Sequence, residues 1–116
     1  MFRISICYHH PDDPTAFDEH YRRIHAPLVD ALPRLAGYTA GRCQALTPTT
    51  PAPYHLVTQL FFTSAQDMRT ALASVEMRRA SKDMANFATA GAITYWSEDL
   101  DLPLRDSATT TVSQGD

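Results

Sequence analysis

The feature that most constrains the fold is the alternation of apolar residues, with a period of two, in several short segments. Stretches with a helical pattern separate these segments. Residues 2–8 place Phe2, Ile4, Ile6 and Tyr8 on one face of a strand. Residues 54–63 alternate in the same way, and large side chains on both faces indicate that both are at least partly covered. Two further strands are predicted over residues 38–46 and 92–96.

The first helix is predicted to begin beside Pro14, with either Asp13 or Thr15 as its capping residue, and to end between residues 32 and 37. Pro27 lies within this helix, where it removes an amide donor and disfavours helical geometry at Ala26. The sequence therefore predicts a kink or a restart of the helix there.

The second helical region begins after Ser64, which can cap a helix that runs through residue 73. Met68, Leu72 and Val75 form its expected buried stripe, and a further helical piece is predicted over residues 76–87.

The order of elements is βαββαβ, which describes an α+β protein with the ferredoxin-like arrangement: a four-stranded antiparallel sheet with its helices on one face. The other face of the sheet is left uncovered and is expected to expose several large apolar side chains of the strands at residues 2–8, 38–46 and 54–63. Exposed apolar surface of this extent is typical of an interface. Two such sheets pairing face to face predict a homodimer that forms an α+β barrel.

Length and composition limit the function classes. The 116 residues suit a single domain, predicted over residues 1–104, followed by a polar tail over 105–116 that we expect to be disordered. Ten Lys and Arg against 13 Asp and Glu give a net charge of -3, which does not favour nucleic-acid binding.

No apolar run is long enough for a membrane span or a signal peptide, so no membrane partner is expected. Cys7 and Cys43 lie on candidate strands without metal-ligand spacing, and we interpret them as small buried residues. This pattern fits a reducing cytoplasm.

His25 lies on the mostly apolar stripe of the first helix, with Phe17, Tyr21, Ile24 and Leu28 at helical spacing. An imidazole in apolar surroundings needs a hydrogen-bond partner, and burial disfavours its charged form. Both effects can tune it for proton transfer near neutral pH. The alternative is a structural histidine bonded to a backbone carbonyl.

Three stretches together resemble the EthD family of dimeric α+β barrel proteins. They are the pattern from Phe17 through Tyr21 to His25-Ala26-Pro27-Leu28, the segment Asp83 to Phe87, and the aromatic strand at residues 59–62. The resemblance covers nearly all of residues 2–98, whereas the proline-rich loop at 48–53 and the residues after 98 carry no family pattern.

The resemblance implies a ferredoxin-like dimer more firmly than it implies a reaction, because one fold hosts many activities. Related barrels include polyketide cyclases, cofactor-free monooxygenases, muconolactone isomerases and dehydratases. These place a small aromatic or lactone-like substrate between helices and sheet. His25 is the expected catalytic acid or base, and Tyr8, Tyr21 and Asp83 are the candidate substrate-binding residues.

Asp83 has two alternatives: it accepts from the His25 imidazole, or it caps the segment leading to Phe87. No glycine-rich phosphate loop and no metal-binding histidine motif is present, so neither a cofactor nor a metal is expected. The functional alternatives are a cofactor-independent cyclase, isomerase or dehydratase, a non-catalytic binding protein for a small apolar or aromatic ligand, and a purely structural dimer.

Overall fold

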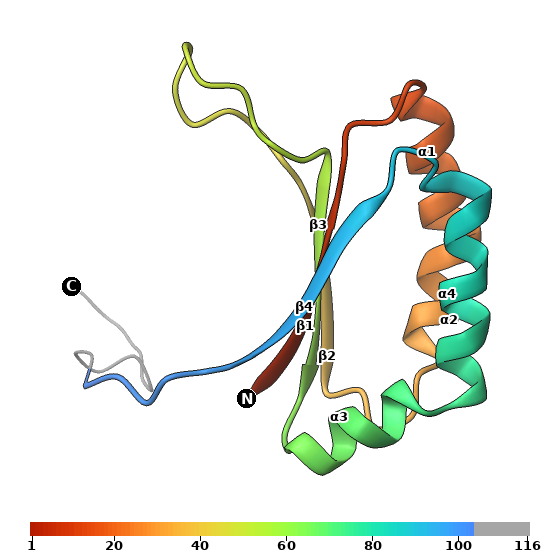
Figure 1. The fold of residues 1–116 in the computed structure, drawn as a ribbon, viewed down its shortest axis with the longest axis vertical. Helices are drawn as coiled ribbons and strands as arrows, with labels where there is room; N and C mark the ends of the chain where they lie inside the picture. Colours follow the sequence, from red (N-terminus) through yellow and green to blue (C-terminus); the bar gives the residue numbers. More distant parts are fainter. Residues whose placement is uncertain (104–116) are drawn as a thin grey trace.

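The fold is built on a four-stranded antiparallel sheet whose helices cover one face (Figure 1). The structure is a computed structural model that describes residues 1–103, so the predicted tail at 105–116 lies outside the described residues. The elements in chain order are β1 (Phe2–Tyr8), α1 (Pro14–His20), the π-helical turn η1 (Tyr21–His25), α2 (Ala26–Asp30), β2 (Gly37–Arg42), β3 (Leu56–Phe62), α3 (Ala65–Leu72), α4 (Val75–Phe87) and β4 (Ala92–Glu98).

The strand order is β2-β3-β1-β4, and every neighbouring pair is antiparallel. Ile4 of β1 lies opposite Leu60 of β3, and both side chains are buried beneath the helices. The period-two alternation of β3 appears directly in its burial, because Leu56, Thr58, Leu60 and Phe62 are buried whereas the residues between them are half-buried. The predicted ferredoxin-like α+β fold is confirmed.

Strand β2 is shorter than predicted, because it ends at Arg42 instead of continuing to residue 46. The amide of Cys43 still donates to the carbonyl of His55, but the chain then enters the proline-rich loop. Pro51 and Pro53 have no amide hydrogen to offer a neighbouring strand, so the ladder cannot extend in that direction.

The second helical region is split in two. The Ser64 hydroxyl caps α3 by accepting from the amide of Asp67, and the Ser74 hydroxyl caps α4 by accepting from the amide of Met77. The predicted stripe was wrong in part: Met68 is buried, whereas Leu72 and Val75 are 45% and 46% exposed. Val75 begins α4, after the chain has turned at the end of α3, so it does not share a helix face with Met68; Leu72 is the last residue of α3.

The sheet face opposite the helices is open in this chain. The segment between β2 and β3 and residues 99–103 after β4 both project to this side (Figure 1). Ile93 and Tyr95 of β4 are about half exposed on this face, beside Cys7 and Ser5 of β1, so its exposed large apolar residues lie on the fourth strand and not on the first three as predicted. Within residues 1–103, no helix is long and apolar enough to cross a membrane.

Candidate functional site

The first helical region runs without a break from residue 14 to residue 30, and η1 widens it in the middle. Asp13, one of the two predicted capping residues, accepts from the amide of Ala16. The amide of Ala26 donates to the carbonyl of Tyr21, five residues earlier, which defines a π turn. Of the predicted kink or restart at Pro27, the restart describes the structure: α2 begins at Ala26 with Pro27 in its first turn, and Ala26 keeps helical dihedral angles of -57° and -42°.

The proline explains why the turn is wide. In a regular α-helix, the ring of Pro27 would collide with the carbonyl of Arg23, and Pro27 has no amide hydrogen to donate. A π turn immediately before Pro27 accommodates the ring while the chain remains helical.

This π turn decides where two histidines point. His20 and His25 are five residues apart, which in an α-helix is about 1.4 turns and separates their directions. A turn closed by hydrogen bonds between residues five apart brings such residues toward one side. Both imidazoles consequently reach Asp83 on α4.

Asp83 accepts hydrogen bonds from three side chains. Nδ1 of His25 lies 2.9 Å from Oδ2, and Nε2 of His20 lies 3.0 Å from each carboxylate oxygen. Nδ2 of Asn86 donates to Oδ1 at 3.0 Å. Asp83 lies inside α4 and does not cap it, so the capping alternative is wrong and the imidazole alternative describes the structure.

The electrostatics of this cluster set the protonation of both partners. Burial acts to raise the pKa of Asp83, but hydrogen bonds from Asn86, His20 and His25 outweigh it and hold the pKa below its ordinary value. Burial lowers the pKa of His25 more than its interaction with Asp83 raises it. At neutral pH, an ionised carboxylate therefore accepts from a neutral imidazole.

This pairing selects one tautomer of His25. An ionised carboxylate only accepts hydrogen bonds, so the imidazole hydrogen must be on Nδ1, and Nε2 is left as an unprotonated acceptor. Within residues 1–103, Nε2 of His25 has no hydrogen-bond partner. The ring is 2% exposed, and its centroid lies 4.6 Å from that of Phe87. An unprotonated imidazole nitrogen of this kind can accept a proton from a group within hydrogen-bond reach.

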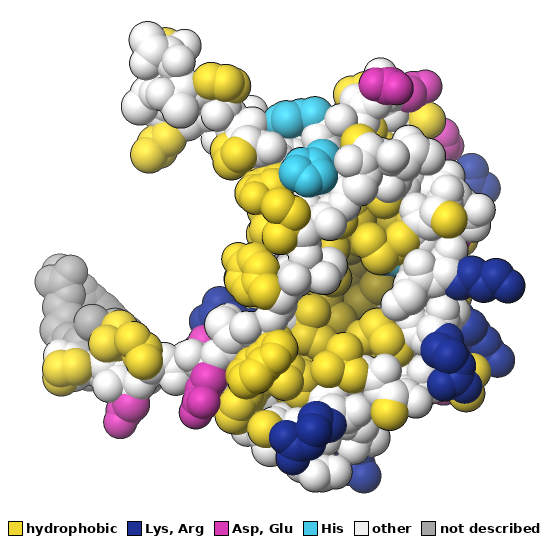
Figure 2. Space-filling view, in the orientation of Figure 1, with side chains coloured by type: hydrophobic (Ala, Val, Ile, Leu, Met, Phe, Trp, Pro, Cys, Tyr) yellow, Lys and Arg dark blue, Asp and Glu magenta, His cyan; other side chains and the backbone are white. Residues whose placement is uncertain are grey.

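A cavity of about 340 Å³ lies against His25, between the helices and the sheet. Its walls are mostly apolar and include Ile6, Val29, Leu60, Met77 and Met84. In the space-filling view, the hollow between sheet and helices is lined largely by hydrophobic side chains (Figure 2). The volume falls in the range of small-molecule sites, and His25 is one of its few polar side chains.

The other predicted site residues take different positions. Asp83 lies behind His25 and is not among the residues lining the cavity. Tyr21 is one turn before His25, but its hydroxyl bonds to that of Tyr38 and it lines a different cavity. Tyr8 is fully buried under Phe17 and Phe87, and its hydroxyl has no partner among the described residues. Substrate binding by these three residues stays a prediction.

The sequence interpretation missed His20 and Asn86 as partners of Asp83. His20 also stacks on Phe87, with ring centroids 5.0 Å apart. The signal for Asn86 was its place three residues after Asp83 on a helix, which puts the two side chains in reach. The signal for His20 was Pro27, because a wider turn can accommodate a proline within a helix, whereas the predicted kink or restart did not specify such a turn. Among residues 1–103, no group of three His, Cys, Asp or Glu side chains is arranged to hold a metal ion.

Fold and site together define a small α+β protein of the ferredoxin-like class with a histidine-lined cavity between its helices and its sheet. The EthD domain family model matches residues 9–91. The chain belongs to the EthD domain family, as its sequence resemblance predicted.

Relatives support this membership. The uncharacterized 11.0 kDa protein in the thcB-thcC intergenic region of Rhodococcus erythropolis is 41% identical over 99 residues, which cover 85% of this chain and 95% of that protein. An ethyl tert-butyl ether D (EthD) family protein from Bacillus halodurans, known from a crystal structure, is 26% identical in sequence to this chain. The two structures align with a TM-score of 0.79, and the match covers 86% of this chain and 99% of that one.

The fold also occurs in more distant proteins. A dimeric ferredoxin-like protein of unknown function from Thermobifida fusca is 16% identical, with a TM-score of 0.63 over 83% of this chain and 88% of that one. At this identity the likeness concerns the fold alone.

Proposed function

We propose that this protein is a cofactor-independent enzyme that transfers a proton on a small, largely apolar carbonyl or aromatic compound. The reaction class is that of a cyclase, isomerase or dehydratase. The observation that carries the proposal is the buried His25, which Asp83 holds in the Nδ1-protonated tautomer beside an apolar cavity.

In this mechanism, a carbonyl compound enters the cavity with its apolar body against the aliphatic walls. Nε2 of His25 removes a proton from the carbon next to the carbonyl and becomes an imidazolium. The Asp83 carboxylate stabilises that charge through Nδ1, and the imidazolium then returns the proton to a different atom or to a departing hydroxyl. Asp83 acts as a positioning residue in this scheme.

Proton abstraction can be measured without knowledge of the natural substrate. We expect the protein in deuterated buffer to accelerate deuterium incorporation at the methyl group of acetophenone, the first of a panel of small ketones followed by NMR. His25→Gln should slow this exchange by about a hundredfold, the contribution typical of a positioned general base. His9→Gln, which removes a histidine that does not line the cavity, is the matched control.

The same experiment separates the proposal from its alternative, a non-catalytic binding protein. Saturable binding of the ketones without exchange above the buffer rate would establish the binding protein and end the enzyme proposal. Exchange that His25→Gln and His9→Gln slow equally would remove His25 from the mechanism.

We further propose that two copies pair through the open sheet face to form an α+β barrel. Val57, Ile93 and Tyr95 lie on this face, and Cys7 is opposite both Val57 and Ile93 in the sheet register. Pairing would remove this apolar surface from water. The Thermobifida fusca neighbour is described as dimeric, which supports the proposal.

The cytoplasm is the proposed location. Cys7 and Cys43 are both free thiols, with Cys7 buried and Cys43 half-buried. Free cysteines are usual in reducing compartments.

A further inference from the structure

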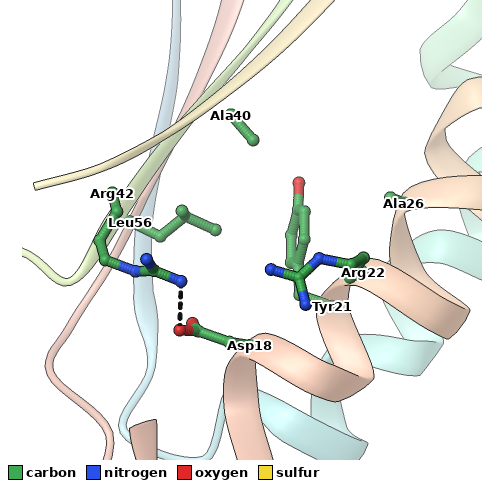
Figure 3. Close-up of a pocket in the computed structure, with 7 residues that line it drawn as sticks. All are labelled: Asp18, Tyr21, Arg22, Ala26, Ala40, Arg42 and Leu56. Atoms are coloured by element: carbon green, nitrogen blue, oxygen red, sulfur yellow. Dashed lines mark hydrogen bonds and ion pairs between the residues drawn. The ribbon is translucent and has the colours of Figure 1, made fainter. Parts of the chain in front are cut away.

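A second cavity, of about 390 Å³, lies on the other side of the first helical region, between η1 and the sheet edge formed by β2 (Figure 3). It shares no lining residue with the cavity at His25. Helix turn η1 separates the two, because Tyr21 and Arg22 face this cavity whereas His25 faces the other.

Two arginines converge at this cavity. The guanidinium groups of Arg22 and Arg42 point toward one another across it, with Asp18 beside Arg42 (Figure 3). Nη2 of Arg42 donates to Oδ2 of Asp18 at 2.6 Å. Arg22 has no ion-pair partner among residues 1–103. Like charges that converge in this way repel, and an anion placed between them relieves the repulsion.

The single carboxylate of the cavity is already engaged. Oδ1 of Asp18 accepts from Nε2 of His55 at 2.7 Å, while Oδ2 accepts from Arg42. Burial acts to raise the pKa of Asp18, but the hydrogen bonds from His55 and Arg42 outweigh it and hold the pKa below its ordinary value. Asp18 therefore compensates Arg42, and the charge of Arg22 remains uncompensated at this cavity.

The rest of the wall is apolar and leaves space. Ala26 and Ala40 contribute only methyl groups, and Leu56 and the ring of Tyr21 complete the lining. A bare inorganic anion would use the guanidinium groups and leave this apolar surface unused. An anion with an apolar body uses both, since a guanidinium fork matches the two oxygens of a carboxylate.

We infer that this cavity binds a small organic carboxylate with an apolar or aromatic body, held by Arg22 with Arg42 and seated on Ala26, Ala40 and Leu56. The site is independent of the proposed chemistry at His25. It gives the protein a second ligand, and the two sites share only the helical segment between them.

Benzoate is the probe for this site, titrated into the full chain while NMR follows the backbone amides of residues 21 and 40. We expect saturable shifts of these amides. Arg22→Gln should weaken benzoate binding about tenfold, the loss expected of one charge-assisted hydrogen-bond pair. Arg23→Gln is the matched control, because Arg23 is adjacent, carries the same charge and pairs with Glu19 away from the cavity. It should leave benzoate affinity within about twofold.

Two more variants keep the test decisive. Ala40→Leu should fill the cavity and weaken benzoate binding without removing charge, and His25→Gln should leave benzoate binding unchanged. The absence of saturable shifts in the wild-type chain, an equal loss in Arg22→Gln and Arg23→Gln, or phosphate binding as tight as benzoate binding would each overturn the inference. Loss of benzoate binding in His25→Gln would overturn it as well, by assigning benzoate to the other cavity.

Discussion

Nδ1 of His25 donates a 2.9 Å hydrogen bond to Oδ2 of Asp83, and this bond joins η1 to α4 across 58 residues of sequence. It fixes the tautomer of a buried imidazole that lines an apolar cavity. The pair also ties the first helical region to α4, so we expect it to affect stability.

Asp83→Asn should destabilise the protein by about 1 to 3 kcal/mol, because the amide offers one accepting oxygen where the carboxylate receives three donors. Urea unfolding followed by circular dichroism measures the change. The control is Asp12→Asn at an exposed position, which should change stability by less than about 0.5 kcal/mol. Equal stability of the two variants would show that the cluster does not stabilise the fold.

Stability should fall as the pH is lowered from 7 through the ordinary histidine range. Because the folded-state pKa of His25 is below its ordinary value near 6.5, the unfolded chain binds more protons in this window, and protonation favours unfolding. One such group contributes at most about 1.4 kcal/mol per pH unit. Urea unfolding at a series of pH values should show a shallower slope for His25→Gln than for the wild type. Identical slopes would contradict the shifted pKa.

Asp83 adds a loss of stability at lower pH. Its folded-state pKa is depressed, so its contribution is complete above the unfolded value near 3.9 and disappears as the pH falls through the folded value. Asp83→Asn should remove this acid-sensitive part from the same pH series. Retention of the full acid loss in that variant would assign it to other carboxylates.

Removing a tyrosine hydroxyl should have opposite effects at two neighbouring sites. Tyr8→Phe deletes a buried hydroxyl without a partner among the described residues and should be neutral or stabilising by up to about 1 kcal/mol. Tyr21→Phe breaks the bond to Tyr38 and should cost about 1 kcal/mol. Thermal and urea unfolding of both variants test this, and a destabilised Tyr8→Phe would reveal an interaction of that hydroxyl.

A charge on the open sheet face should prevent dimer formation. Tyr95→Asp and Ile93→Asp would place a carboxylate in the proposed interface and should weaken association at least a hundredfold, since each also removes a large apolar contact. Ile24→Asp, at an exposed apolar residue of η1 on the helical side, is the matched control. Sedimentation analysis should show monomers for the sheet variants only. A dimer that survives both changes would place the interface elsewhere.

Local patterns predicted most of the fold. The alternation in β1 and β3 set which side chains face the helices, and the Ser64 hydroxyl marked the start of α3, whereas the Ser74 cap of α4 was not predicted. The prediction of β2 failed at its end. Residues 43–46 can pair only with a segment that has amide hydrogens to donate, and the prolines of the neighbouring loop have none. The prediction of the Met68 stripe failed where the chain turned between two helices.

The candidate site was less accessible from the sequence. His25 could be singled out because an imidazole on an apolar stripe requires a hydrogen-bond partner. The choice between helix capping and bonding to the imidazole for Asp83 required knowledge of which element packs against α4. His20 was missed because a π turn changes the direction of side chains by an amount that an ideal helical period does not contain, and Pro27 signals a disturbed helix without specifying that turn.

By itself, the sequence determined the class of fold, the faces of the sheet and the position of one unusual histidine. The first two follow from the periodicity of apolar residues. The third follows from the cost of burying a polar side chain on an apolar helix face. Only the tertiary structure decided that Asp83 accepts from His25 and His20, and that Arg22 and Arg42 converge on a separate cavity. These contacts join residues from different elements, so their geometry exists only after the helices have packed on the sheet.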